Sequence, residues 1–216
     1  LYGETLELVP LPRGSCQMGT TEAGWTSDLN DEQPVHGVNI DYDLYMGKYE
    51  ITQAQWLAVM WDWPSTDPGQ QPDANSGLGD DYPAYWIPWS SITDPSEGFL
   101  VYANDYLYGQ TDLTLRLPSE AEWEYACRAG STSQFCFGNS NCGPSDCSFA
   151  CNLGDYAWFC GNNTPETKGS KPVGTRLPNA FGLCDMHGNV LEWCQDFYHS
   201  DNTGAPDNGE AWLTPE

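Results

Sequence analysis

Two carboxylates in the last quarter of the sequence, Asp185 and Glu192, bracket a turn at Gly188 and Asn189. Carboxylates combined with turn carbonyls can supply several oxygen ligands, the donor type that Ca²⁺ prefers. The alternative is that Glu192 caps the turn by accepting hydrogen bonds from backbone amides, without a metal. We expect calcium here, and we expect the neighbouring His187 to be a packed or hydrogen-bonded residue rather than a ligand.

Cysteines form the second group that could do chemistry, and nine in 216 residues indicate disulfides and an oxidising compartment. Structural zinc is the alternative, but the spacings contain no pair of CxxC knuckles and only three histidines are present. An odd number leaves at least one thiol free, bonded to another chain, or paired outside this sequence. The nine are Cys16, Cys127, Cys136, Cys142, Cys147, Cys151, Cys160, Cys184 and Cys194.

Disulfide connectivity cannot be deduced from nine cysteines, but two local arrangements are suggestive. Cys142 and Cys147 lie in a loop that contains Gly and Pro, which favours a local disulfide between them. Cys184 and Cys194 flank the calcium-like turn, and their candidate partners are each other, Cys16 and Cys160.

Three helices are expected to position these groups. Glu50–Met60 has an apolar stripe and a plausible N-cap at Thr52. Ser96–Leu107 is a second candidate. The third has the clearest start, because Ser119 and Glu122 have the spacing of a capping box.

Elsewhere the sequence predicts short strands and irregular backbone. Leu6–Pro10 is a short apolar run, and Val35–Leu44 partly alternates as a half-buried strand does. Trp61–Asp81 is rich in Pro, Gly, Asp and Ser and is expected to form a surface loop. Cys136–Gly169 shows little periodicity, so disulfides, a metal or aromatic packing must hold it. No internal repeat or linker is present, and one domain over residues 1–216 is the simplest prediction.

The composition narrows the class of protein. The net charge of −24 repels phosphate backbones and anionic lipid, so we expect no nucleic-acid partner. No apolar run is long enough to span a bilayer. The chain begins at Leu1 without a signal peptide, and we interpret it as a mature or partial product of a secreted or otherwise extracytoplasmic protein.

Several segments together resemble the formylglycine-generating-enzyme (sulfatase-modifying factor) family in their order and spacing. They are Gly47–Trp56, Leu115–Ala126, Pro172–Gly174, Pro178–Leu183 and Asp185–Trp193. The resemblance covers nearly the whole chain. It implies a compact α+β fold related to C-type lectins, with low regular secondary structure, here braced by disulfides.

The resemblance also implies metal ligands. A family calcium site would use the Asp185 and Glu192 side chains with the Gly188 and Val190 carbonyls. A second family site would begin at Asn152 and Leu153, but its acidic partner position falls near Thr164–Glu166, where this sequence departs from the pattern.

The family's oxidation of a substrate cysteine needs copper held by a cysteine pair that follows an Arg-Gly-Gly-Ser-Trp-like strand. Here the last recognisable motif is Glu192–Asp196, and the sequence runs to Glu216 without such a pair. We therefore carry over no catalytic residue and expect the catalytic segment to be absent. Cys127 occupies a position that bridges to that segment in some members of the family.

Two functions follow as hypotheses. The first is an exported, non-catalytic binding or assembly module with a protein or glycan ligand, whose core another chain could complete by adding a strand. The second is a copper-dependent oxidase whose catalytic cysteines lie beyond this chain. Five loop aromatics could form a ligand surface, although we expect most of them to fill the core: Trp61, Trp63, Tyr85, Trp86 and Trp89.

Overall fold

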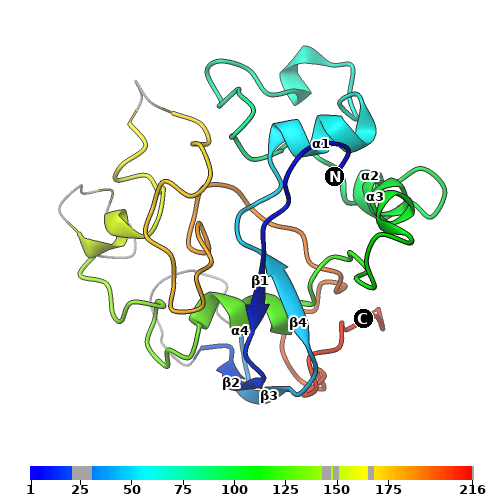
Figure 1. Ribbon diagram of the computed structural model, residues 1–216. Helices are drawn as coiled ribbons and strands as arrows, with labels where there is room; N and C mark the ends of the chain where they lie inside the picture. The colour runs from blue at the N-terminus through cyan, green and yellow to red at the C-terminus, as the bar shows by residue number, and fades with distance from the viewer. Residues whose placement is uncertain (21–30, 143–146, 148–150, 165–167, 216) are drawn as a thin grey trace.

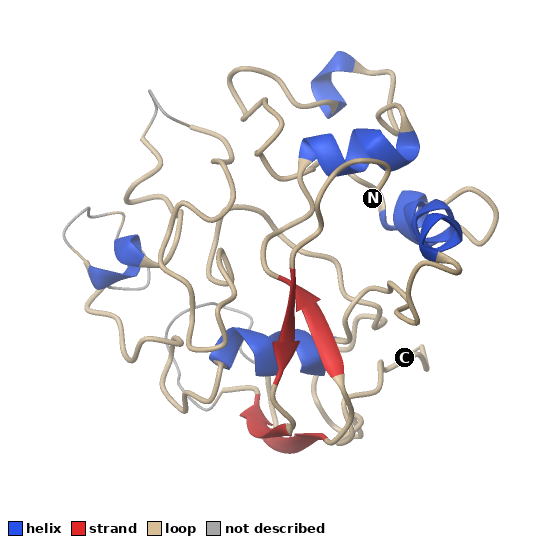
Figure 2. Cartoon of the chain, viewed as in Figure 1, coloured by secondary structure: helices blue, strands red, loops and turns tan. Residues whose placement is uncertain are grey.

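The computed structural model describes residues 1–20, 31–142, 147, 151–164 and 168–215. Its helices and strands are short, and loops make up most of the described chain (Figures 1 and 2). In chain order the elements are β1 (Leu8–Leu11), β2 (Gly14–Met18), β3 (His36–Ile40), β4 (Leu44–Gly47), α1 (Gln53–Met60), η1 (Pro68–Gln70), α2 (Trp89–Thr93), α3 (Phe99–Leu107), α4 (Glu120–Arg128) and η2 (Asn152–Asp155).

The strands form two antiparallel pairs. β1 pairs with β4, with Leu8 opposite Gly47, and β2 pairs with β3, with Gly14 opposite Ile40. Helix α4 crosses behind the β1–β4 pair, while α1, α2 and α3 gather at a separate corner (Figure 1). Among the described residues each sheet has only two strands, so both keep open edges.

Two packed regions hold the four strands and helices α1 to α4. Where α1 meets α3, Trp56 stacks on Phe99 with ring centroids 5.3 Å apart. The α4 side packs against the strands through two adjoining clusters, whose buried members are Leu11, Met18, Val38, Ile40, Ala121, Tyr125, Ala126, Cys127, Leu183 and Met186. The second region is the one that positions the candidate site, because Leu183 and Met186 lead into the 185–192 turn.

The predicted N-caps Thr52 and Ser119 are confirmed, although the first helix begins at Gln53 rather than at Glu50. Thr52 accepts a hydrogen bond from the Gln55 amide, and the Gln55 side chain accepts one from the Thr52 amide. Ser119 and Glu122 form the same reciprocal capping box at α4. The second helix begins at Phe99, later than expected, because the Asp94 carboxylate accepts hydrogen bonds from amides of the preceding turn.

The predicted Cys142–Cys147 disulfide is wrong. Cys142 bonds to Cys151 and Cys147 bonds to Cys160, with Cα–Cα distances of 5.3 and 5.1 Å. The reason lies next to these cysteines: the amides of Asn141 and Asn152 each donate to the other's side-chain oxygen, at 3.2 and 2.9 Å. This exchange places residues 142 and 151 side by side.

The suggested pairings of Cys184 and Cys194 are also wrong. Both thiols are free, as is Cys16, and Cys160 is already bonded to Cys147. The two remaining free thiols are Cys127 and Cys136.

The loop aromatics do not mainly fill the core as expected. Only Trp63 is buried, Tyr85 is half-buried, and Trp61, Trp86 and Trp89 are exposed. Trp61 projects from the C-cap of α1, where its φ is 61°. Trp86 has a left-handed φ of 60°, Pro88 is extended, and Trp89 begins α2, a five-residue helix that buries none of its side chains.

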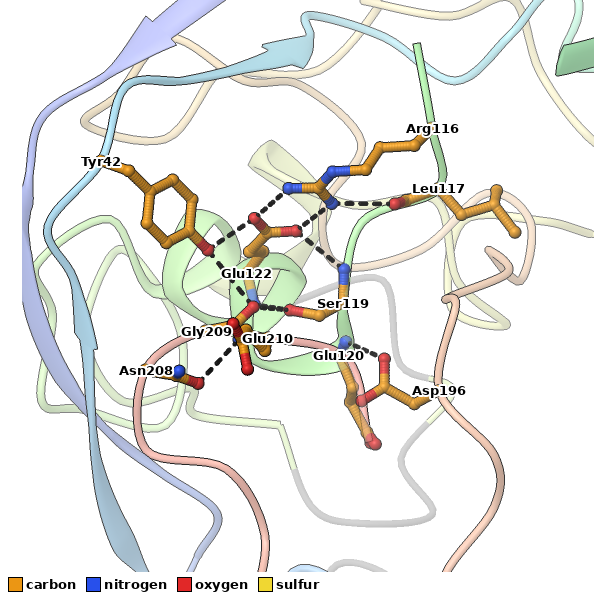
Figure 3. A network of polar contacts seen from close by, with 10 residues as sticks. All are labelled: Tyr42, Arg116, Leu117, Ser119, Glu120, Glu122, Asp196, Asn208, Gly209 and Glu210. Carbon is orange, nitrogen blue, oxygen red and sulfur yellow. Dashed lines mark hydrogen bonds and ion pairs between the residues drawn. The ribbon is translucent and has the colours of Figure 1, made fainter. Parts of the chain in front are cut away.

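A buried polar network joins α4 to the strands and to the C-terminal segment (Figure 3). Glu122 is fully buried and accepts hydrogen bonds from both terminal nitrogens of Arg116, at 2.6 and 2.5 Å, and from the Tyr42 hydroxyl at 2.7 Å. The Gly209 carbonyl accepts from the Ser119 hydroxyl at 2.8 Å and from Tyr42 at 3.2 Å. The network therefore fixes the end of the chain against the start of α4.

Among the described residues, no helix has the length and apolar character that crossing a bilayer requires.

Candidate functional site

The 185–192 turn has a backbone that only certain residues tolerate. Asp185 and Asn189 have positive φ values of 61° and 78°. The Gly188 amide donates to the Asp185 carbonyl at 3.2 Å, and the Asn189 amide donates to the Trp158 carbonyl at 3.1 Å. A Cβ atom at Gly188 would lie 2.3 Å from the Trp158 carbonyl oxygen, so this close approach requires glycine.

Asp185 is the most strongly buried acid of the turn, with 2% of its surface exposed. Its Oδ2 accepts a hydrogen bond from the Gly174 amide at 2.6 Å, whereas its buried Oδ1 has no hydrogen-bond partner. Burial raises the pKa of this carboxyl, although the Gly174 amide and the nearby Arg176 oppose that rise. A buried oxygen without a partner is uncommon in native proteins and is a position that a cation could satisfy.

Glu192 keeps more than a third of its residue surface exposed, yet its carboxylate lies among protein atoms. This crowding raises the pKa of Glu192 to about 7, the Asp185 charge adds to the rise, and a hydrogen bond from Trp123 Nε1 at 3.2 Å opposes it. No described backbone amide donates to Glu192, so the metal-free cap proposed for it in the sequence is not formed.

Glu50 supplies that cap instead, although it was not among the residues predicted for this site. Its Oε1 accepts from the Val190 amide at 3.2 Å and its Oε2 accepts from Asn189 Nδ2 at 2.8 Å. Burial raises the pKa of Glu50 to about 9, and the charges of Glu192 and Asp185 contribute. The signal available in the sequence was that Glu50 is the one carboxylate in the Gly47–Trp56 motif.

The donor set of the turn fits a hard cation. Besides the free Asp185 Oδ1, the carbonyls of Gly188 and Val190 accept no hydrogen bond from any residue that the structure describes. No three His, Cys, Asp or Glu side chains in the described ranges are grouped to hold a metal ion. A cation here would therefore depend on the backbone carbonyls as well as on Asp185 and Glu192.

The oxygens expected for a second calcium site are already engaged within the protein. Asn152 Oδ1 accepts from the Asn141 amide and from the Ser140 hydroxyl, at 3.2 and 3.3 Å. The Leu153 carbonyl accepts from the amides of Tyr156 and Ala157. Residues 165 and 166 of the expected partner position lie outside the described residues, and this second site stays a prediction.

His187 is a packed residue, as predicted. Its Nε2 accepts a hydrogen bond from the Cys136 amide at 3.2 Å, its Nδ1 lies 3.5 Å from Cys127 Sγ, and its ring meets Phe135 and Phe137 edge-on. Burial lowers the His187 pKa to about 4. The ring is therefore neutral at physiological pH, and because Nε2 accepts, Nδ1 carries the proton.

The five free thiols share one electrostatic property. Burial raises the pKa of each of them, to about 11 for Cys16 and about 12 for Cys194, and upward for Cys127, Cys136 and Cys184. All five are therefore protonated at neutral pH. Thiolates, not thiols, attack disulfides, so the raised pKa of these five cysteines makes them poor nucleophiles at neutral pH.

Known proteins resemble this chain along most of its length. The sulfatase-modifying factor enzyme 1-like domain model matches residues 3–214. The chaperone protein LppX of Paenibacillus barcinonensis is 31% identical over 204 residues, which cover 80% of this chain and 70% of that protein. The formylglycine-generating enzyme of Mus musculus is 27% identical over 231 residues, which cover 89% of this chain and 58% of that protein.

Solved structures show the same likeness in three dimensions. PvdO from Pseudomonas aeruginosa matches with a TM-score of 0.73 and 29% identity over 97% of this chain and 77% of that chain. Treponema denticola variable protein 1 matches with a TM-score of 0.65 and 21% identity over 97% of this chain and 81% of its own, which is a likeness of fold alone.

Proposed function

Because this chain belongs to the sulfatase-modifying factor enzyme 1-like family, we propose that it is an exported, calcium-stabilised binding or assembly module without oxidase chemistry of its own. The two disulfides are consistent with a location outside the cytoplasm. One relative is a protein called a chaperone, which agrees with a binding role. The relationship to C-type lectins stays a prediction from the family, and fold by itself does not fix function.

The state of the free thiols carries the non-catalytic part of this proposal. Copper(I) binds thiolate sulfur, and the oxidation expected of the family uses a pair of cysteines as its ligands. In the described part of the chain, every free thiol has a pKa raised by burial. A copper(I) ion would therefore have to displace a proton from each cysteine that it bound, at a cost that burial increases.

The test is copper(I) binding together with oxidation of a cysteine in a synthetic sulfatase-type peptide. We expect neither stoichiometric copper(I) binding nor aldehyde formation by mass spectrometry. A formylglycine-generating enzyme assayed in parallel is the positive control. Aldehyde formed at a rate above the copper-only background would contradict the proposal.

Calcium is expected to stabilise the 185–192 turn, through Asp185, Glu192 and the Gly188 and Val190 carbonyls. With free calcium at about a hundred times its Kd, the gain is about 2.7 kcal/mol. For a chain of this size, that corresponds to a fall in Tm of roughly 5–10 °C when a chelator is added. The measurement is thermal unfolding with calcium and with excess chelator.

Asp185→Asn is the variant that tests the ligand itself. Asparagine can still accept the Gly174 hydrogen bond but lacks the charge, so the Tm of this variant should not respond to calcium. Asp105→Asn changes an exposed acid on α3 and should respond as the parent does. A parent Tm that is the same with and without chelator would exclude the site.

The second candidate function, a formylglycine-generating oxidase, is favoured by the likeness to the mouse enzyme. This chain spans 58% of that enzyme's length, so the activity of the whole enzyme does not transfer to it. A longer reading frame with an Arg-Gly-Gly-Ser motif and two further cysteines would support the oxidase. The peptide assay above, repeated on that longer chain, separates the two functions.

A further inference from the structure

An exposed apolar surface lies where residues 84–89 run beside residues 190–194. We call it the tryptophan surface and define it as Trp86, Trp89, Leu191 and Trp193. Their exposed fractions are 56%, 39%, 101% and 51%. A group of large apolar side chains exposed together is characteristic of an interaction site, whereas single exposed ones need no explanation.

The two segments hold the indole rings in place by exchanging hydrogen bonds. Trp89 Nε1 donates to the Cys194 carbonyl at 3.2 Å, and Trp193 Nε1 donates to the Ile87 carbonyl at 2.9 Å. Each indole therefore has its polar atom satisfied while much of its ring remains in solvent. Rings fixed in this way lose little conformational entropy when a partner packs on them.

The backbone at Trp86 adds a second observation. Its φ is 60°, a left-handed conformation that a bulky non-glycine residue rarely adopts. Strain of this kind concentrates at binding and catalytic sites. More than half of the Trp86 surface is exposed, so burial of this side chain contributes little to the stability of the fold. The strained backbone is therefore better explained by contacts that Trp86 makes with a partner.

The negative charge of the two segments that form this surface favours a cationic partner. Residues 84–98 contain two acidic residues and residues 189–216 contain six, and neither segment contains a lysine or an arginine. Indole faces attract cations, above all the arginine guanidinium, and nearby carboxylates strengthen that attraction.

From this arrangement we infer that the tryptophan surface docks an extended segment of a partner protein in which Arg or Lys alternates with apolar side chains. This inference rests on the proposed binding function and names its partner class. A neutral glycan would gain nothing from the acidic surroundings. A second copy of this chain would bring another net charge of −24 against the same surface.

Two synthetic peptides test the inference by isothermal titration calorimetry. One alternates Arg with Leu, and the other has Gln in place of every Arg. We expect the Arg peptide to bind and to weaken as salt rises, because its charges are screened. The Gln peptide is expected to bind at least tenfold more weakly, and equal affinity for the two would overturn the inference.

Variants locate the binding. Trp86→Gly combined with Leu191→Ser should reduce affinity for the Arg peptide at least tenfold, since glycine accepts the positive φ and Leu191 is fully exposed. Leu191→Ser alone leaves the backbone at Trp86 untouched and should reduce affinity severalfold. This single variant keeps the prediction testable if the double variant does not fold. Tyr108→Ser removes an aromatic that is 90% exposed at the end of α3 and should bind as the parent does.

Other occupants would give different results. Oligosaccharide binding that both variants abolish, without Arg-peptide binding, would identify a glycan site. A dimer in sedimentation velocity that dissociates in Leu191→Ser would identify a second copy. Either result would overturn the inference and leave the broader binding function in place. Oxidation of the peptide cysteine would instead contradict the proposed non-catalytic function, and it would not bear on the tryptophan surface.

Discussion

Replacing Glu122 with alanine is expected to lower the free energy of unfolding by about 3 kcal/mol, because it removes the buried partner of an ion pair whose Arg116 side chain is 45% exposed and can still be hydrated. Arg116, Tyr42 and the Ser119 amide would all lose their acceptor at once. Urea denaturation followed by tryptophan fluorescence measures the loss. Asp43→Asn, which breaks the exposed pair with Arg13, should cost at most about 1 kcal/mol.

The pH dependence follows from the same contacts. Burial alone would raise the pKa of Glu122, but the hydrogen bonds from Arg116, the Ser119 amide and Tyr42 outweigh it and hold the pKa below its ordinary value. Because the folded-state pKa is depressed, this stabilisation is present above the unfolded-state pKa of about 4.3 and is lost as the pH falls through the folded-state pKa.

Glu122→Gln separates the contribution of Glu122 ionisation to the pH dependence of stability from the contributions of the other acidic residues. The variant keeps an acceptor for the capping box but cannot ionise, so its stability deficit against the parent should be constant near neutral pH and should shrink below about pH 4. The measurement is a pair of urea denaturation series over pH. A deficit that grows on acidification would mean that Glu122 is protonated in the folded protein.

Gly209→Ala is expected to lower the free energy of unfolding by about 2–5 kcal/mol. Placing an alanine in the left-handed region costs about 1–2 kcal/mol, and overpacking by its Cβ atom costs about 1–3 kcal/mol. Gly209 has a φ of 76°, and its Cβ would lie 2.4 Å from Ile40 Cδ1 and 2.5 Å from the Tyr42 hydroxyl oxygen. The substitution would push Tyr42 away from Glu122 and loosen the C-terminal segment.

Gly204→Ala is the matched control for this prediction. Gly204 also has a positive φ, 92°, but the nearest atom to its Cβ would be in the Trp212 ring at 3.9 Å. It should show only the backbone cost of about 1–2 kcal/mol. Equal losses in the two variants would show that the contact with Ile40 and Tyr42 is not tight.

The sequence predicts those features of the fold that are set by residues close together in the chain. The N-cap at Thr52 and the capping box at Ser119 depend on residues at most three apart, and both form as expected. The Asp185–Glu192 turn is equally local, and one oxygen of its buried Asp185 carboxylate has no hydrogen-bond partner; the calcium expected there stays a prediction.

What the sequence could not predict depends on residues far apart. Glu50 reaches Val190 across 140 positions, and no periodicity connects the two. The cysteine pairing was decided by the Asn141–Asn152 exchange rather than by the spacing of the cysteines themselves. Trp86 and Trp89 look like core residues by type, and their exposure follows from the paths of two separate segments.

Both disulfides close within residues 142–160, and no other disulfide joins described cysteines, so no covalent link reaches the strands or α4. A reducing agent would therefore release one corner of the molecule while the network around Glu122 keeps its own cooperative stability. In hydrogen-exchange terms we expect this corner to open more readily than the strands and α4, together with the 185–192 turn, whose Asn189 amide donates to the Trp158 carbonyl. A partner that reduces or reshuffles those bonds could remodel that corner without unfolding the domain.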